Sequence, residues 1–151
     1  MKKISSRFSI AVHILSLISM LPMPTGDLIA ASVNTNPVII RKIIAQLKKA
    51  GLVNVRAGTG GASLSKTPAE ITLLDVYRAV EVVDGNELFN FHEHPNPACF
   101  VGANIENALR ESMLSAQAAM EQELASVTIE RLANKIVACG QRSGWADQGS
   151  V

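Results

Sequence analysis

The most reactive side chains of this 151-residue chain lie in one segment, where His92, Glu93 and His94 come shortly before Cys99. Imidazole and thiol groups are competent metal ligands, so His92, His94 and Cys99 are candidates for a metal site. A His-x-His pair near one cysteine is a pattern of low specificity, and we predict no resident metal. A lone thiol can also sense oxidants when its pKa is lowered, which the charges of Glu87 and Glu93 oppose. The other interpretation is that Cys99 packs in a loop near a subunit interface.

A second set of side chains is suited to hydrogen bonding with nucleic acid. Arg41 can donate two bonds to a guanine, Asn36 can contact an adenine or a phosphate, and Val38 can touch a thymine methyl group. Arg56 can enter a minor groove while glycine amides beside it approach phosphates. Each cation taken alone is equally compatible with a solvated surface charge. The full predicted DNA-binding set is Ser6, Arg7, Thr35, Asn36, Val38, Arg41, Lys42, Arg56, Gly58, Thr59 and Gly60.

The distribution of charge supports a polyanionic partner. Residues 1–68 contain nine Lys and Arg side chains and a single acid, Asp27, which gives a net charge of +8. Residues 69–151 contain five cations and twelve anions, a net charge of −7, and together the halves return the total of +1. A basic half joined to an acidic half indicates that the basic half binds a polyanion such as double-stranded DNA. Chance asymmetry is the alternative.

These side chains need elements that position them, and the N-terminal part of the chain has the pattern of a helix-turn-helix. Apolar periodicity and the placement of proline and glycine predict helices over residues 6–21, 27–32 and 37–50. The inward face of the third helix is predicted to be Ile40, Ile43, Ile44 and Leu47, and its outward face Arg41, Lys42, Ala45, Lys48 and Lys49. Asn36 is expected to cap the third helix, with Pro37 in its first turn and Gly51 just past its end. A recognition helix of this kind presents its N-terminal residues to base edges while neighbouring groups hold phosphates.

A basic hairpin and a fourth helix are expected to follow. Alternating apolar residues predict two strands over 52–57 and 62–66, joined by a glycine-rich turn. Thr72 and Asp75 have the spacing of a capping box, which predicts a helix over 73–83. Residues 1–83 are therefore interpreted as a winged helix-turn-helix DNA-binding domain.

The rest of the chain is predicted to be a loop followed by helices. A sensor-type loop is expected over 84–103, where glycine and proline break regular structure. A long helix should span 104–127, because apolar residues recur there at near-heptad spacing, at Ile105, Leu109, Met113, Ala116, Met120, Leu124 and Val127. The sequence offers no second long helix to receive this seam, so a second copy of the chain is the expected partner. Packing on its own domain is the alternative. A last helix over 129–138 completes the dimerisation helices, 104–138, and residues 139–151 are expected to form a disordered tail.

The uncharged stretch near the N-terminus, residues 8–26, follows three basic residues, as in a signal peptide. Polar side chains nevertheless recur every three or four residues from Ser6 to Ser16, which makes the predicted helix amphipathic. The stretch is also short and polar for a membrane span. The two cysteines fit no disulfide scaffold. We therefore expect a cytoplasmic protein with no membrane partner.

Three stretches carry a family resemblance. They read SSRFSIAVHIL at 5–15, NPVIIRKIIAQLKKAGLV at 36–53 and VRAGTGGASLSKTPAEITLLDVYRAVE at 55–81. They are similar to the Rrf2 (BadM-type) family of bacterial transcriptional regulators, which includes regulators of iron–sulfur, nitric-oxide and cysteine metabolism. The resemblance covers about residues 1–138. It implies a dimer with an N-terminal winged helix and a long crossing helix, in which Arg41, its neighbours and the wing at Arg56 carry DNA recognition.

The same resemblance raises the question of a bound iron–sulfur cluster. Several members of that family bind an iron–sulfur cluster through three cysteines in the loop. Here only Cys99 is present, and the positions six residues before and after it are Glu93 and Ile105. Because iron–sulfur ligation usually needs several thiolates, we expect no cofactor.

The sequence thus predicts a mainly α protein with a small β-hairpin wing, in which a winged helix-turn-helix is joined to a long C-terminal dimerisation helix. The predicted function is that of a sequence-specific transcriptional regulator, a repressor, which acts as a homodimer on a palindromic operator. No catalytic constellation is present, so an enzyme is not expected, and the sequence does not identify a small-molecule effector. One alternative is a metal- or thiol-responsive regulator that senses through residues 92–99. Another is an interaction module that keeps the fold without binding DNA.

Overall fold

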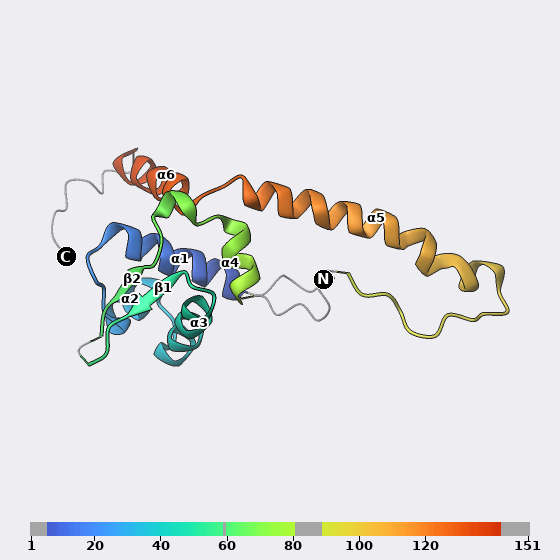
Figure 1. Cartoon of the computed structure of the whole chain (residues 1–151), viewed down its shortest axis with the longest axis horizontal. Coiled ribbons are helices and arrows are strands. Elements are labelled where there is room, and N and C mark those ends of the chain that lie inside the picture. Colours follow the sequence, from blue (N-terminus) through green and yellow to red (C-terminus); the bar gives the residue numbers. More distant parts are fainter. Residues whose placement is uncertain (1–5, 59, 81–88, 143–151) are drawn as a thin grey trace.

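The computed structural model describes residues 6–58, 60–80 and 89–142 of the chain. Over these ranges the chain forms a helical domain, which includes α4 (Leu73–Val80) and one small antiparallel sheet. A long helix, α5 (Phe100–Ala125), runs away from that domain (Figure 1). This confirms the predicted architecture of a mainly α protein with a β-hairpin.

The first three helices contain the predicted helix-turn-helix, which is made by the second and third of them. They are α1 (Ser6–Met20), α2 (Gly26–Val33) and α3 (Pro37–Lys49). The Thr25 hydroxyl caps α2 by accepting a hydrogen bond from the N–H of Leu28 at 3.3 Å. Asn34 ends α2 in the left-handed region, with φ of 57°. The carbonyl oxygen of the Asn36 side chain then accepts from the N–H of Val38 at 2.9 Å, so the predicted cap of α3 is confirmed.

The wing is a hairpin of β1 (Val53–Val55) and β2 (Ala62–Leu64). Its three residue pairs run from Val53 opposite Leu64 to Val55 opposite Ala62. The strands are shorter than the predicted 52–57 and 62–66, because only these three pairs form a regular ladder. Single hydrogen bonds extend the pairing at each end, from Arg56 N–H to Gly61 C=O at 2.9 Å and from Ser65 N–H to Leu52 C=O at 3.0 Å.

The core is aliphatic and lies where α1, α3 and α4 meet the base of the wing. The predicted inward face of α3 is confirmed, because Ile40, Ile43 and Leu47 are buried and Ile44 is partly buried. Residues from distant parts of the chain complete the same cluster: Ala11, Ile14, Leu15, Ile29, Leu52, Val53, Ile71, Val76, Val80 and Ile129. Helix α3 is therefore anchored in the core through its apolar face, and its opposite face is exposed to solvent.

A short junction ties the C-terminal helices to this domain. Thr72 and Thr128 form an antiparallel bridge, flanked by hydrogen bonds from Leu73 N–H to Val127 C=O and from Ile129 N–H to Ile71 C=O, both at 2.9 Å. We call residues 71–73 and 127–129 the bridge junction. Residues 71–73 connect a 3-10 turn (Pro68–Glu70) to α4 (Leu73–Val80). Residues 127–129 connect α5 (Phe100–Ala125) to α6 (Ile129–Arg142).

The start of α4 confirms the predicted capping box. The Thr72 N–H donates to an Asp75 carboxylate oxygen at 3.0 Å, and the Asp75 N–H donates to the Thr72 hydroxyl at 3.2 Å. The predicted end of this helix, 81–83, falls outside the described residues, as does the beginning of the predicted loop, 84–88.

Three predicted helix boundaries near the C-terminus are wrong. The long helix begins at Phe100 and not at Asn104, because Cys99 occupies its N-cap position and already accepts a hydrogen bond from Ala103 N–H at 2.9 Å. It ends at Ala125, so Val127 of the predicted seam lies in the bridge junction. The last helix runs on to Arg142, and residues 139–142 therefore do not belong to a tail. A single glycine, Gly140, does not end a helix, since it costs only about 1 kcal/mol relative to alanine. Residues 143–151 lie outside the description.

Among the described residues, no single helix is both long and apolar enough to cross a membrane. Helices α2 and α3 have the length and composition of a membrane span only when they are counted together as one broken segment, and they are bent by 111° relative to each other.

The bridge junction gives a testable consequence for stability. Ile129→Ala is expected to lower the free energy of unfolding by about 2–5 kcal/mol, because it removes a fully buried side chain that anchors α6. Ile136→Ala, at a position 45% exposed on the same helix, should change it by no more than about 0.5 kcal/mol. Denaturant unfolding followed by circular dichroism, at one protein concentration, measures both. Equal losses at the two positions would contradict the anchoring role.

Candidate nucleic-acid interface

The N-terminal half of α3 presents the side chains that the sequence singles out for base contact. Asn36 and Arg41 are exposed, and Val38 and Ile39 are 48% and 40% exposed although both are apolar. The side-chain oxygen of Asn36 accepts the capping hydrogen bond, which uses one of its two lone pairs and orients the amide. A bidentate contact with adenine needs both groups of the amide to face the base. The cap therefore favours a contact of the NH₂ group with a phosphate over a bidentate contact with adenine.

One side of α3 faces the start of α1 across a surface hollow. Four predicted residues from three segments line it together: Ser6, Arg7, Thr35 and Lys42. Gln46 lies in the same hollow, one helical turn after Lys42. The fold therefore brings the predicted contacts at the N-terminus next to the turn before α3, although they are far apart in the sequence.

The other side of α3 faces the wing across a second hollow, which we call the helix–wing groove. Arg41 and Lys48 line it from α3, and Val55, Gly60, Gly61 and Ala62 line it from the wing. Its remaining surface is largely apolar and comes from Pro24, Gly26, Ile29, Ile44 and Ala45. Arg41 and Lys42, adjacent in sequence, thus serve opposite sides of the same helix.

The wing tip carries the other predicted contacts. Arg56 is exposed at the end of β1. Gly58 and Gly60 have φ of 89° and 64°, a region that L side chains rarely adopt, so this turn requires glycine at both positions. Thr59, also in the predicted set, lies outside the described residues.

The charges on this face are not neutralised by nearby acids. None of Arg41, Lys42, Lys48, Lys49 and Arg56 forms an ion pair within the part of the chain that the structure describes. The one acid of residues 1–68, Asp27, lies in the first turn of α2, where a negative charge stabilises the helix dipole. Exposed cations without local partners produce a positive field that attracts and retains a polyanion.

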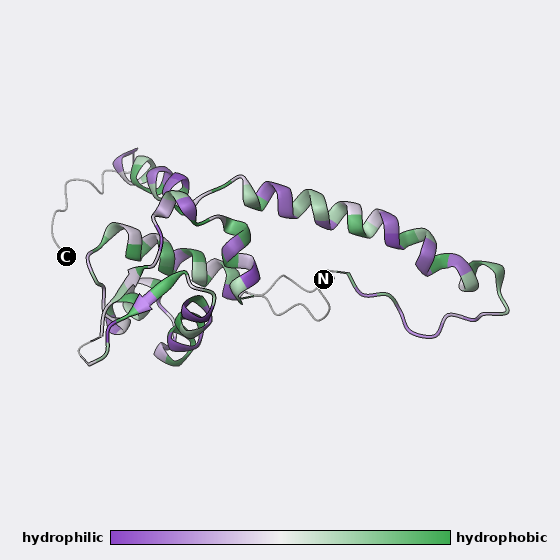
Figure 2. Ribbon diagram, viewed as in Figure 1, coloured by the Kyte–Doolittle hydropathy of each residue, from purple (hydrophilic) through white to green (hydrophobic). Residues whose placement is uncertain are grey.

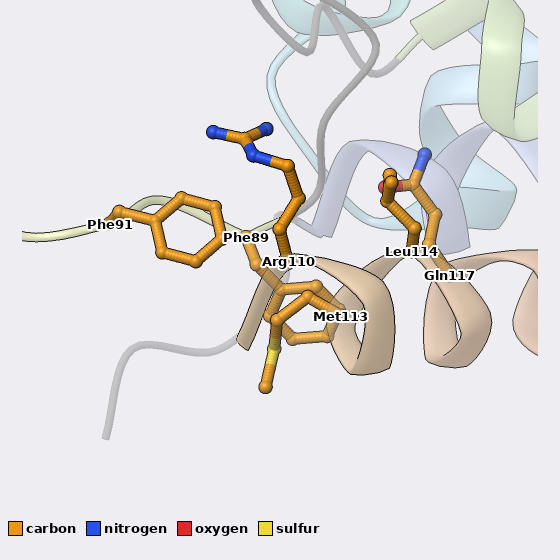
Figure 3. Close-up of a pocket in the computed structure, with 6 residues that line it drawn as sticks. All are labelled: Phe89, Phe91, Arg110, Met113, Leu114 and Gln117. Carbon is orange, nitrogen blue, oxygen red and sulfur yellow. The ribbon is translucent and has the colours of Figure 1, made fainter. Parts of the chain in front are cut away.

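The predicted sensor loop does not lie on this face. Its described part, residues 89–99, leads away from the helical domain to the far end of α5, remote from α3 (Figure 1). Figure 3 shows Phe89 and Phe91 of this segment beside Arg110 and Met113 of α5. The guanidinium carbon of Arg110 is 4.8 Å from the centre of the Phe91 ring, a cation–π contact, and Arg110 also pairs with Glu106.

The metal-ligand candidates of that loop do not converge. No group of three or more His, Cys, Asp or Glu side chains able to hold a metal ion occurs among the described residues, and His92, His94 and Cys99 form no such group. The chain bends sharply between them, since His94 has φ of 55°. These residues therefore do not provide a preformed metal site.

Within the single chain Cys99 is exposed, at the N-terminus of α5, so it does not pack against its own subunit. Its side chain makes no capping hydrogen bond of good geometry. The backbone N–H groups of Gly102 and then Val101 nevertheless lower the pKa of the thiol, and the opposing effect of burial is smaller. A helix N-terminus is a known setting for a reactive thiolate. The groups that lower the pKa of this thiol are backbone amides, whereas the side chains considered from the sequence were the opposing carboxylates Glu87 and Glu93.

Some residues of this surface were missed by reasoning from the sequence. Gln46 was detectable, because it follows Lys42 at helical spacing. Lys48 was placed on the outward face of α3 but not in the predicted DNA-binding set. Gly61 and the residues of the 21–24 turn gave no local signal, since their place beside the wing depends on how the domain packs.

Comparison with known proteins gives one consistent result. A profile of the Rrf2 family, described as an iron-dependent transcriptional regulator, matches residues 4–135. YwnA of Bacillus subtilis (strain 168), provisionally named an HTH-type transcriptional regulator, is 53% identical over 133 residues, which cover 88% of this chain and 98% of YwnA. A crystal structure of a protein provisionally described as DNA-binding is 49% identical, with a TM-score of 0.69, and the match covers 84% of this chain and 98% of that one. CymR, the global cysteine regulator of B. subtilis, is 25% identical with a TM-score of 0.67, over 89% of this chain and 98% of CymR.

The lowered pKa of Cys99 predicts its reactivity. In a Cys139→Ser chain, the rate of alkylation by iodoacetamide should rise with pH along a curve whose midpoint is lower in the native protein than in the same chain in urea, because a lower pKa yields more thiolate at a given pH. Mass spectrometry of quenched samples gives both curves. A native midpoint equal to or above the unfolded one would contradict the effect of the α5 amides.

Proposed function

The chain belongs to the Rrf2 family of DNA-binding transcriptional regulators, and from that premise we propose that it acts as a homodimeric repressor on a two-fold symmetric operator. The regulators of this family act by binding and not by catalysis, which confirms the prediction that the chain is not an enzyme. The observation that carries the proposal is the exposed, unneutralised basic face of α3, bordered on one side by the start of α1 and on the other by the wing.

Base contact is assigned to the N-terminal half of α3. In a helix-turn-helix, this part of the second helix enters the major groove. Arg41 is the proposed base reader, because it is exposed there and a guanidinium pairs with two acceptors of guanine. Asn36, Lys42, Ser6 and Arg7 are assigned to phosphates, which fix the register without reading sequence. Arg56 and the glycine-rich tip are assigned to the adjacent minor groove.

Pairing with a second copy of the chain is assigned to α5. This helix of 26 residues has no buried residue, although its seam positions Ile105, Leu109, Met113, Ala116, Met120 and Leu124 are apolar. Hydrophobic bands recur along it in Figure 2, and it extends away from its own domain, which argues against packing there. Its length of about 39 Å, at 1.5 Å per residue, suits a lengthwise pairing with the same helix of a second copy. Such a pair would place two α3 helices at a fixed separation, as a palindromic operator requires.

Repression is the simplest regulatory output of such a dimer. A protein that covers two successive major grooves blocks access of the transcription machinery by occupancy alone. No additional activating surface is then needed.

A second candidate is a thiol-responsive regulator, favoured by the exposure and lowered pKa of Cys99. Alkylation of Cys99 would then lower operator affinity, and a Cys99→Ser chain would bind in the same way with or without the reagent. Equal binding before and after alkylation of the unaltered chain would rule this candidate out.

Protection mapping on the DNA that flanks the chain's own coding region tests the main proposal, in the presence and absence of reductant and metal. Two protected half-sites are expected, with centres about 10 base pairs or a multiple of that distance apart. The logarithm of the affinity should fall linearly with the logarithm of salt concentration. An absence of salt-sensitive binding would favour an interaction module on the same fold.

Arg41→Ala is expected to weaken operator binding more than random-sequence binding, with a loss of discrimination of about 1–3 kcal/mol. Lys49→Ala removes one cation from the other end of the same helix and should leave the ratio of the two affinities unchanged. Fluorescence anisotropy titrations at matched salt measure both. If Arg41→Ala weakens both kinds of binding equally, Arg41 holds a phosphate and reads no base.

Leu109→Glu is expected to shift the protein from dimer to monomer, because it places a charge in the apolar seam of α5. Ala118→Glu introduces the same side chain on the opposite side of the helix, at an exposed position, and should leave the dimer intact. Sedimentation velocity over a concentration series distinguishes the two outcomes. A dimer that resists Leu109→Glu would place the subunit interface elsewhere.

A further inference from the structure

The connection between α1 and α2 lies against the wing. Its turn, residues 21–24, reads Leu-Pro-Met-Pro, and Met23 has φ of 45°, in the region that non-glycine residues rarely adopt. The carbonyl oxygen of Pro24 accepts a hydrogen bond from the N–H of Ala62, the first residue of β2, at 3.1 Å. Strand β2 is therefore held on two sides, by β1 along the ladder and by this turn.

Gly61, the residue before Ala62, lies close to Met23 of this turn. It is buried, and a Cβ placed on it would lie 3.2 Å from the Met23 Cε, 3.2 Å from the Met23 carbonyl oxygen and 3.3 Å from the Met23 Cβ. Unlike Gly58 and Gly60, Gly61 does not have a positive φ. Its backbone would accept alanine, so any resistance to a side chain here comes from Met23, which would have to give way by a few tenths of an ångström.

The same residues border the helix–wing groove. Gly61 and Ala62 line its wing side, Arg41 and Lys48 line its α3 side, and Pro24 lies between them. Any displacement of Gly61 away from Met23 therefore moves the wing relative to α3. The groove has two cations on one wall, an apolar floor at Ile29 and Ile44, and no acid among its lining residues. This combination is complementary to alternating phosphates and deoxyriboses.

We infer that Met23 and Gly61 are positioning residues for DNA binding, whose contact sets the distance between the wing and α3 so that the helix–wing groove takes one sugar–phosphate strand. In this arrangement Lys48 binds a phosphate of that strand beside Arg41. The inference rests on the proposed function, because it specifies how the same surface holds DNA. It assigns a role to a turn that precedes the helix-turn-helix motif and that touches no base itself.

The test uses the full-length chain on the operator found by protection mapping. Gly61→Ala is expected to weaken operator binding by about tenfold, as for the coupling of residues in direct contact. Gly26→Ala is the matched control, since it adds the same methyl group to the same groove but meets nothing within 4 Å, and it should bind like the unaltered chain. Combining Gly61→Ala with Met23→Gly, which removes both side-chain atoms that oppose the new Cβ, should restore part of the lost affinity.

A second readout separates positioning from a general loss of structure. Dimethyl sulfate methylates guanine N7 in the major groove and adenine N3 in the minor groove. With Gly61→Ala, protection of adenines under the wing should be lost while protection of guanines under α3 is retained. If Gly61→Ala does not fold, Met23→Gly alone serves instead, because loss of the contact should also reduce adenine protection selectively.

The outcomes are distinguishable. If the unaltered chain protects no DNA, the proposed function fails and this inference fails with it. If the unaltered chain protects an operator and Gly61→Ala binds equally well, only the inference fails. Equal losses for Gly26→Ala and Gly61→Ala would mean that filling the groove matters and that the position of the wing does not. A uniform loss of guanine and adenine protection with Gly61→Ala would also contradict the inference.

Discussion

The arrangement of the whole molecule depends on one small antiparallel contact, the bridge junction of residues 71–73 and 127–129. Two backbone hydrogen bonds and the buried side chains of Ile71 and Ile129 join segments that are far apart in the sequence. Because α5 ends just before this junction and α6 begins within it, the junction fixes the direction in which α5 leaves the domain. It also holds α6 against α1. A change of angle here would move the far end of a long helix by many ångströms.

This constraint links the two functions assigned to the chain. The reading surface belongs to α1, α3 and the wing, while the unburied apolar seam belongs to α5. If two copies pair through that seam, the junction converts the geometry of pairing into the separation of two α3 helices. Cys99 lies at the opposite end of α5 from the junction. Chemistry at this thiol would therefore act through the helix pair, and not by direct contact with the reading surface of its own subunit.

Much of the fold was predictable, because it depends on interactions between residues close in sequence. The cap at Asn36, the capping box at Thr72 and the inward face of α3 were all read from spacing and residue type, and the structure confirms each one. Boundaries that depend on weaker local signals were misjudged. Helix α5 begins earlier than predicted because Cys99, which is not a typical capping residue, occupies the cap position. Helix α6 continues through Gly140 because one glycine does not stop a helix.

By itself the sequence determined the elements, their caps, the basic half and the seam, since helix periodicity, capping and net charge need only the order of residues. Tertiary structure alone decided which of these residues meet. It set Ser6 and Arg7 beside Thr35 and Lys42 and placed Met23 against Gly61. The physical reason is that these contacts join segments distant in sequence. Their geometry follows from how the aliphatic core packs, which no local pattern encodes.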